Sequence, residues 1–482
     1  MISPGVFPYL ESQVPNPEPR FMKPRIAIVS PFLDKRHGTE RCVAEQIDRL
    51  TADYEIVLYS QAVCDVDLAR ITWRRIPRLP GPHLFAYGWW VLANHAWRWW
   101  DARFRGLRPA LVYSPGINCY DADVISVHVV FAEFYRRAGH TLGFGANPLR
   151  AWPRLAHRRL YYRLIMALER VVYGGRKVTL TAVSTKVARE LAQHYGWTLE
   201  WGREAAAFNA MGISHPLSGR VQLTEGMAAA SRPQSEGGGV VPPIPVIFHG
   251  IDPGRFNPET RARRRAGARA TLGMGEDEFC LLLVGNDWKN KGLPTLLGSL
   301  DRLREPRVRL LVVGQDTVEP YRKMIDRLGL GRRVTFRSPR PDVEFYYAAA
   351  DLYAGPSLED AFGLPPLEAM ACGLPVITSA QAGVSEVITE GVDGFVIDNP
   401  QDSAKLSDLI ALLYQNQDLR KRVGEAAALT AKQYSWDRNA RELGQVFQEV
   451  LRRRNSLVNG MQGTLGGAPD TRAEARVGQN VQ

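Results

Sequence analysis

Two carboxylates flank a short loop in the second half of the chain. Asp360 and Glu368 are separated by seven residues, and the loop contains one glycine. A carboxylate accepts hydrogen bonds from sugar hydroxyls, whereas backbone N–H groups at a helix N-terminus bind phosphate. The N–H groups placed to do so belong to four consecutive residues: Ala361, Phe362, Gly363 and Leu364. The spacing predicts a nucleotide-sugar site; a plain strand–turn–helix with solvated acids is the structural alternative.

A strand and a helix must position these groups. Leu352–Ala354 is a short apolar run typical of a buried strand. Pro365–Cys372 is predicted to be a helix, because paired prolines mark its start and Gly373 marks its end. In open parallel sheets, ligands bind at the carboxyl ends of the strands, where such loops begin.

A second loop supplies positive charge. The apolar segment Cys280–Gly285 predicts a buried strand, and the loop after it contains Lys289 and Lys291. A lysine contributes about 1.5–3 kcal/mol through a charge-assisted hydrogen bond, so both could bind a diphosphate. Two exposed surface lysines are the alternative interpretation.

The first half of the chain offers a glycine and a histidine. Gly38 lies in the loop between an expected strand, Arg25–Ser30, and a helix, where glycine allows close approach of a ligand. His128 follows the expected strand Val124–Val127 and could hydrogen-bond a sugar hydroxyl or position an acceptor. An ordinary turn and a structural histidine are the respective alternatives.

The segment Ala350–Thr378 resembles the acid-x7-acid signature of the retaining GT-B glycosyltransferases related to glycogen and sucrose synthases. The resemblance implies that Glu368 binds the nucleotide ribose. It also implies that Asp360, where the family usually has Glu, contacts the transferred sugar. Lys291 matches the phosphate lysine of the family, whereas Asn286 replaces its usual arginine.

Two N-terminal residues extend this resemblance. His128 is similar to the cleft histidine that touches the sugar, and Gly38 to the glycine loop over the donor phosphates or the acceptor. The resemblance therefore implies three catalytic residues: His128, Asp360 and Lys291. It implies these donor-binding residues: Gly38, Lys289, Lys291, Ala361, Phe362, Gly363, Leu364 and Glu368. No metal is expected, and the only cofactor-like ligand is the nucleoside-diphosphate sugar itself.

The expected fold class is α/β: a GT-B fold with two Rossmann-like, doubly wound domains that face a cleft. We expect a disordered extension over 1–22 and an acceptor domain over 23–248 with an insertion at about 200–243. A nucleotide-sugar domain is expected over 249–432, a helix that crosses back to the first domain over 433–454, and a disordered tail over 455–482.

The expected function is retaining transfer of a sugar from a nucleoside diphosphate to a glycan or lipid-linked acceptor. The family implies front-face attack, in which the leaving phosphate accepts the proton of the acceptor. A non-catalytic nucleotide-sugar-binding protein, a GT-B epimerase or phosphorylase, and a nucleic-acid binder are the alternatives.

Composition bounds the location. The net charge of +11 favours an anionic partner. The five cysteines are odd in number, widely spaced and without a C-x-x-C motif, which argues against a disulfide framework or a zinc site and favours a reducing cytoplasm. Tryptophans and arginines in Leu84–Trp100, and a basic helix at Trp152–Tyr173, suit peripheral contact with the anionic inner face of the cell membrane or with an anionic acceptor. Solvated helix faces are the alternative. No nucleic-acid partner is expected. Five apolar residues of the expected helix Trp152–Tyr173 are expected to face the core: Leu160, Leu164, Ala167, Leu168 and Val171.

Overall fold

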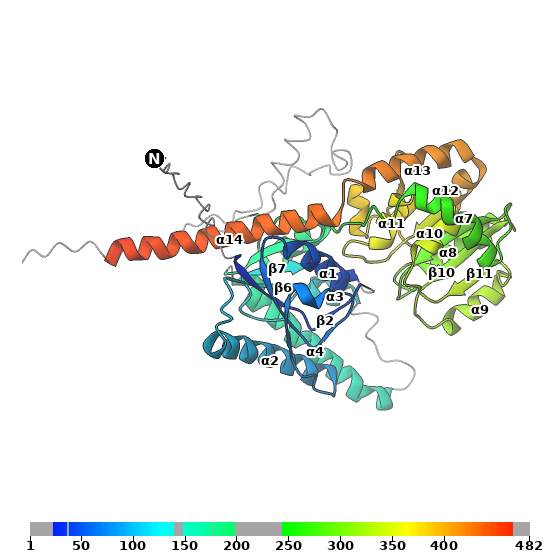
Figure 1. Cartoon of the computed structure of the whole chain (residues 1–482). Helices are drawn as coiled ribbons and strands as arrows, with labels where there is room; N and C mark the ends of the chain where they lie inside the picture. The colour runs from blue at the N-terminus through cyan, green and yellow to red at the C-terminus, as the bar shows by residue number, and fades with distance from the viewer. Residues whose placement is uncertain (1–22, 36–37, 139–147, 176, 198–242, 466–482) are drawn as a thin grey trace, which may run out of the picture.

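The computed structural model describes residues 23–35, 38–138, 148–175, 177–197 and 243–465. Within these ranges the chain forms two six-stranded parallel sheets (Figure 1). The expected extension over 1–22, almost all of the insertion expected at about 200–243, and residues 466–482 of the expected tail lie outside the described residues.

The first sheet has the strand order β5-β3-β1-β6-β7-β8, and every pair is parallel. Its strands are β1 (Arg25–Val29), β3 (Glu55–Ser60), β5 (Thr72–Arg75), β6 (Leu111–Pro115), β7 (Val124–Val127) and β8 (Thr179–Ala182). A small parallel pair, β2 (Phe32–Leu33) with β4 (Ala62–Val63), accompanies it. The helices of this half are α1 (Gly38–Leu50), α2 (His83–Phe104), α3 (Phe131–Ala138), α4 (Pro148–Gly174) and α5 (Thr185–Tyr195).

The second sheet repeats the same order as β11-β10-β9-β12-β13-β14. Its strands are β9 (Phe279–Val284), β10 (Val308–Val313), β11 (Val334–Arg337), β12 (Leu352–Gly355), β13 (Val376–Ser379) and β14 (Phe395–Ile397). Its helices are α7 (Pro258–Leu272), α8 (Leu293–Leu303), α9 (Glu319–Arg327), α10 (Glu344–Ala349), α11 (Leu364–Ala371), α12 (Ser403–Gln415) and α13 (Gln417–Ala431). Both sheets have the doubly wound order: strands are added on one side of the first strand and then on its other side. In sheets of this kind, ligands bind at the point where the order reverses.

The long helix α14 (Trp436–Leu465) leaves the second half and runs along the first (Figure 1). Phe447 is fully buried against Tyr54, and the side chains of Gln46 on α1 and Asn439 on α14 form a buried hydrogen bond of 2.9 Å. The helix continues to Leu465, so residues 455–465, which were expected to belong to the disordered tail, are helical. The apolar stripe of α14 fastens the two halves together.

The buried face of α4 differs from the expected one. Leu160, Leu164 and Val171 are 54%, 36% and 71% exposed, and Ala167 is exposed as well. Leu168 alone of the predicted stripe packs against the core. The face that is buried carries Ile165, Glu169, Val172 and Tyr173.

A buried carboxylate explains this error. Glu169 accepts hydrogen bonds from the backbone N–H groups of Phe131 and Ala132, at 2.8 and 3.0 Å, and from the Tyr195 hydroxyl at 2.7 Å. These donors offset the cost of burying the acid. In return, Glu169 provides an acceptor for two backbone N–H groups in the first turn of α3 that have no partner within the helix. The predicted apolar stripe does not contain Glu169, and it is rotated by about one residue from the face that is buried.

Among the described residues, the helices are too short or too polar to cross a membrane. The two halves share one hydrophobic cluster that includes Val127 and Ala182 of the first sheet and Phe362 and Met370 of the second half. Segments that follow the strands of both sheets therefore meet at a closely packed interface.

Candidate active site

The β12–α11 loop has the geometry that its sequence predicts for an anion site. Gly363 precedes α11 with φ 98°, a left-handed conformation that glycine adopts without strain, and two prolines occupy the first turn of the helix. Within the described part of the chain, the N–H groups of Ala361, Phe362 and Gly363 donate to no other backbone group. These groups are free to bind an anion at the carboxyl edge of the second sheet.

Lys291 and Asp360 meet at this loop. Lys291 Nζ lies 2.5 Å from Asp360 Oδ2, and the two side chains are 19% and 18% exposed. The lysine stem lies over Gly285, where an added Cβ would be 3.1 Å from Lys291 Cε. Because β9 and β12 are neighbours at the reversal point of the sheet, the loops that follow them bring the predicted phosphate lysine and sugar acid together.

The other two positions of the lysine loop have different roles. Lys289 is exposed, and its backbone carbonyl accepts a hydrogen bond from the Gly292 N–H. The side chain of Asn286, which stands where the family has arginine, accepts a hydrogen bond of 2.7 Å from the Gln315 N–H. Asn286 therefore supports the adjacent loop of its own sheet.

Glu368 is buried, with 3% of its surface exposed, and both of its oxygens have partners. Arg41 Nη1 lies 2.5 Å from one oxygen, and the Tyr347 hydroxyl donates to the other at 2.7 Å. Burial opposes the charge of Arg41, but Glu368 more than offsets this and raises the arginine pKa. Burial and the neighbouring Glu368 carboxylate also raise the pKa of Tyr347. In this arrangement Glu368 faces α1 of the first domain and presents no free oxygen to a ribose.

Arg41 is a site residue that sequence reasoning missed. It lies in the first turn of α1, three residues after Gly38, and its side chain reaches the acid that the motif singles out. The only signal was its place in the glycine loop. Gly38 itself is exposed, and the space where a Cβ would lie is open. Residues 36–37 of that loop lie outside the described ranges.

His128 lies at the carboxyl end of β7 and is 6% exposed. Its ring faces His249, with centroids 5.3 Å apart, and its Nε2 is 3.4 Å from Ser126 Oγ. Burial, and then the neighbouring His249, lower the pKa of His128 well below its usual value. The imidazole is therefore neutral, and it can donate or accept one hydrogen bond but carries no charge.

Polar contacts close the interface around the loop. Ser184 Oγ donates to the Ala361 carbonyl at 2.7 Å, and Lys186 forms an ion pair with Glu359. Glu386 of the second half accepts hydrogen bonds from the Thr185 and Lys186 N–H groups, at 2.7 and 2.6 Å. A carboxylate from one half thus caps the N-terminus of α5 in the other, where the helix dipole favours negative charge.

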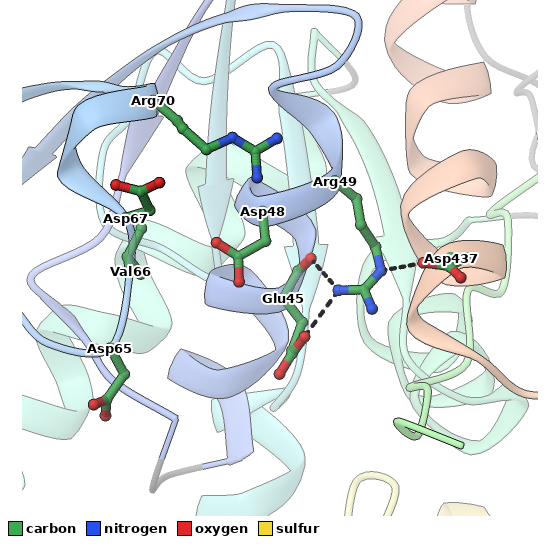
Figure 2. A pocket seen from close by; sticks show the side chains of 8 residues that line it. All are labelled: Glu45, Asp48, Arg49, Asp65, Val66, Asp67, Arg70 and Asp437. Carbon is green, nitrogen blue, oxygen red and sulfur yellow. Dashed lines mark hydrogen bonds and ion pairs between the residues drawn. The ribbon is translucent and has the colours of Figure 1, made fainter. Parts of the chain in front are cut away.

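A separate pocket of about 640 Å³ is lined by α1 and by residues of segment 65–70, and α14 contributes one residue (Figure 2). It is lined by Glu45, Asp48, Arg49, Asp65, Val66, Asp67, Arg70 and Asp437. Figure 2 shows Arg49 held between Glu45 and Asp437. The acids are thus partly neutralised by their own arginine, and none of the predicted site residues lines this pocket.

The second half matches the model of a known domain family. The family model described as Glycosyl transferases group 1 matches residues 265–430. A D-inositol 3-phosphate glycosyltransferase of Corynebacterium jeikeium is 34% identical over 220 residues, which are 43% of this chain and 52% of the relative. One of Streptomyces bingchenggensis is 32% identical over 235 residues, which are 45% and 50% of the two chains. The chain spans about half the length of the curated relatives that it matches.

Solved structures resemble the whole fold. WaaG, a glycosyltransferase involved in lipopolysaccharide biosynthesis, superposes with a TM-score of 0.65 at 22% identity, over 87% of this chain and 99% of its own. Sucrose-phosphate synthase from Thermosynechococcus elongatus gives 0.64 at 17% identity, over 89% and 100%. Anabaena HepE, in a complex with UDP and glucose, gives 0.60 at 18% identity, over 88% and 99%. The expected GT-B fold is confirmed.

Proposed function

We propose that this chain, which has the GT-B fold and contains a glycosyl transferases group 1 domain, is a retaining glycosyltransferase that uses a nucleoside-diphosphate sugar. The observation that carries the proposal is the Lys291–Asp360 pair beside the free N–H groups of Ala361–Gly363. A cation, an acid and backbone donors converge at the edge of the sheet where a diphosphate and its sugar need them.

In the proposed reaction, charge develops on the departing diphosphate while the sugar gains oxocarbenium character. Lys291 and the loop N–H groups would offset the charge on the diphosphate, because they are fixed in a partly dry site. The exposed Lys289 would add a second positive charge. Asp360 would lie beside the sugar once donor binding separates it from Lys291. The neutral His128 would hydrogen-bond a sugar hydroxyl or position the acceptor. No metal ion takes part in the proposed transfer.

The proposed role of Glu368 needs a rearrangement. For this acid to bind the ribose, its ion pair with Arg41 must open or share an oxygen. Donor binding would then release Arg41, whose guanidinium lies at the same interface and suits a phosphate. A nucleoside-diphosphate sugar is proposed as the donor by analogy, since structures of HepE hold UDP, glucose and UDP-glucose. The proposed acceptor is a glycan or lipid-linked glycan.

We also propose peripheral attachment to an anionic membrane from the cytoplasmic side. Helix α2 carries apolar side chains that are at least half exposed: Phe85, Leu92, Trp99, Trp100 and Phe104. Helix α4 packs beside α2 (Figure 1) and exposes further apolar residues: Leu160, Leu164 and Val171. Arginines lie among them, as in the aromatic and basic surfaces that bind lipid headgroups.

The test is a panel of UDP-, GDP- and ADP-sugars offered to the purified full chain. We expect one donor to raise the melting temperature and to release nucleoside diphosphate slowly in the absence of an acceptor. The anomeric configuration of a transferred sugar, read by NMR, should match that of the donor. An inverted product would contradict the retaining mechanism.

The same panel separates the rivals. Binding without any release would point to a non-catalytic nucleotide-sugar binder. An altered sugar still attached to its nucleotide would identify an epimerase, and sugar phosphate formed from phosphate and a glycan would identify a phosphorylase. If no donor binds at all, the proposed function is wrong.

A further inference from the structure

Three potential metal ligands converge beneath the interface. Cys42 belongs to α1, His128 follows β7, and His249 lies in the segment that connects the two halves. One ligand atom of each residue lies within 4.8 Å of the others. The three residues are 1%, 6% and 6% exposed, so the cluster is buried on all sides.

His249 has no polar partner of its own. Neither of its ring nitrogens forms a hydrogen bond to any of the described residues, although the side chain is more than nine-tenths buried. Buried polar groups in native proteins are nearly always hydrogen-bonded, so an orphaned imidazole requires an explanation. His128 has a long polar contact, with its Nε2 3.4 Å from Ser126 Oγ.

We propose that Cys42, His128 and His249 form a binding site for a transition-metal ion of the zinc class. One thiolate and two imidazoles are ligands that Zn²⁺ prefers, and they would fill three corners of a tetrahedron. The fourth position would be left for water or another small ligand. The metal would satisfy one of the two His249 ring nitrogens, neither of which has a hydrogen-bond partner among the described residues.

The two imidazoles of the cluster are suited to bind an ion, whereas the Cys42 thiol must first lose its proton. Burial, and then Arg41, lower the pKa of His249 to about 3, and the pKa of His128 is lowered as well, so both imidazoles are already neutral and ready to bind. Burial, and then Glu45, raise the pKa of the Cys42 thiol. Metal binding would form a bond to its sulfur and release the thiol proton to solvent. The positive charge of the nearby Arg41 is balanced by Glu368.

The shell around the cluster is apolar and comes from both halves. The His249 ring lies 5.0 Å from that of Phe362 and 6.0 Å from that of Trp436, and Cys42 packs with Leu364 and Trp436. A bound ion would therefore join α1, the carboxyl edge of the first sheet and the connecting segment where the two halves meet. It would also occupy His128, so it should inhibit sugar transfer if the proposed function is correct.

The experiment measures metal binding directly and does not depend on activity. The purified full chain is stripped with a chelator and titrated with Zn²⁺ against a chromophoric zinc indicator, and then with Co²⁺. We expect one tight equivalent, a zinc-dependent rise in melting temperature, and a thiolate-to-cobalt charge-transfer band in the near ultraviolet. Cys42→Ser should lose the band and at least about tenfold in affinity, because altering even an outer-shell partner has that effect.

Two further variants keep the result interpretable. Cys64→Ser removes an exposed thiol elsewhere in the first half and should bind zinc like the wild type. His249→Gln should weaken binding as Cys42→Ser does, and it stands in if that variant fails to fold. No tight equivalent in the wild type, or equal affinity in wild type and His249→Gln, would overturn the proposal. If the wild type binds zinc but its metal-free form shows no nucleotide-sugar turnover, the metal site stands and only the proposed function is contradicted.

Discussion

Arg41 Nη1 of the first domain lies 2.5 Å from Glu368 Oε1 of the second, in an ion pair that is almost completely buried. The pair connects the glycine-loop helix α1 with the acid of the β12–α11 motif. Tyr347 holds the other oxygen of the same acid. Glu368, which the resemblance assigns to the ribose, thus also forms an ion pair between the two halves.

Breaking this pair should destabilise the protein strongly. Arg41→Ala leaves a buried carboxylate without its cation, and the expected loss of stability is about 3–5 kcal/mol. The control Arg453→Ala breaks an exposed ion pair with Glu449 and should cost about 1 kcal/mol or less. Chemical unfolding of the variants measures both. A double variant, Arg41→Met with Glu368→Gln, should lose less than the sum of its single changes; strict additivity would mean that the pair is not coupled.

Lys291 should dominate donor binding. Removing one charge-assisted hydrogen bond in Lys291→Ala should weaken the affinity for nucleoside diphosphate about 10- to 150-fold, since such a bond contributes about 1.5–3 kcal/mol. Lys289→Ala should have a smaller effect because Lys289 is exposed. Isothermal titration with the diphosphate measures the affinities, with the exposed Lys323→Ala as control. Equal affinities for Lys291→Ala and wild type would remove this lysine from the site.

The stability of the metal-free protein should fall at acid pH because of His249. Its folded pKa is lowered to about 3, whereas in the unfolded chain a histidine titrates near 6.5. The unfolded state therefore binds a proton first, and stability that is fully present above pH 6.5 is lost as the pH falls towards 3. The loss should approach about 1.4 kcal/mol for each pH unit.

The variant His249→Gln isolates this effect from the titration of carboxylates. The difference in unfolding free energy between wild type and variant should shift by about 2 kcal/mol between pH 7 and pH 5. Wild type should be the more sensitive of the two. Parallel pH profiles for the two proteins would show that His249 is not neutral and buried in solution.

Membrane contact should depend on the tryptophans of α2. Trp99 and Trp100 are 59% and 52% exposed, and a Trp99→Ser, Trp100→Ser double variant should bind anionic liposomes at least about tenfold more weakly. Co-sedimentation at low salt measures the binding. The control is Leu429→Ser, which removes a side chain that is 65% exposed on α13. If the wild type stays in the supernatant, the proposed attachment is wrong.

The local pattern of the chain predicted the elements that hold the site. The expected strand Leu352–Ala354 is β12, and the expected helix Pro365–Cys372 is α11 shifted by one residue. Periodic apolar runs, paired prolines and glycines act over a few residues, so their signal is present in the sequence itself. The resemblance assigned Lys291 and Asp360 to one donor site, and the structure adds that their side chains form an ion pair, because loops after neighbouring parallel strands meet at one edge.

Only the tertiary structure decided which distant surfaces meet. The Arg41–Glu368 pair and the cluster of Cys42, His128 and His249 join segments from different parts of the chain, and no spacing motif connects them. The inward turn of α4 likewise depends on Glu169, whose burial is compensated by donors on α3 and α5. The sequence shows which residues favour burial and turns. The group that offsets the desolvation cost of a buried charge or imidazole is determined by packing between elements.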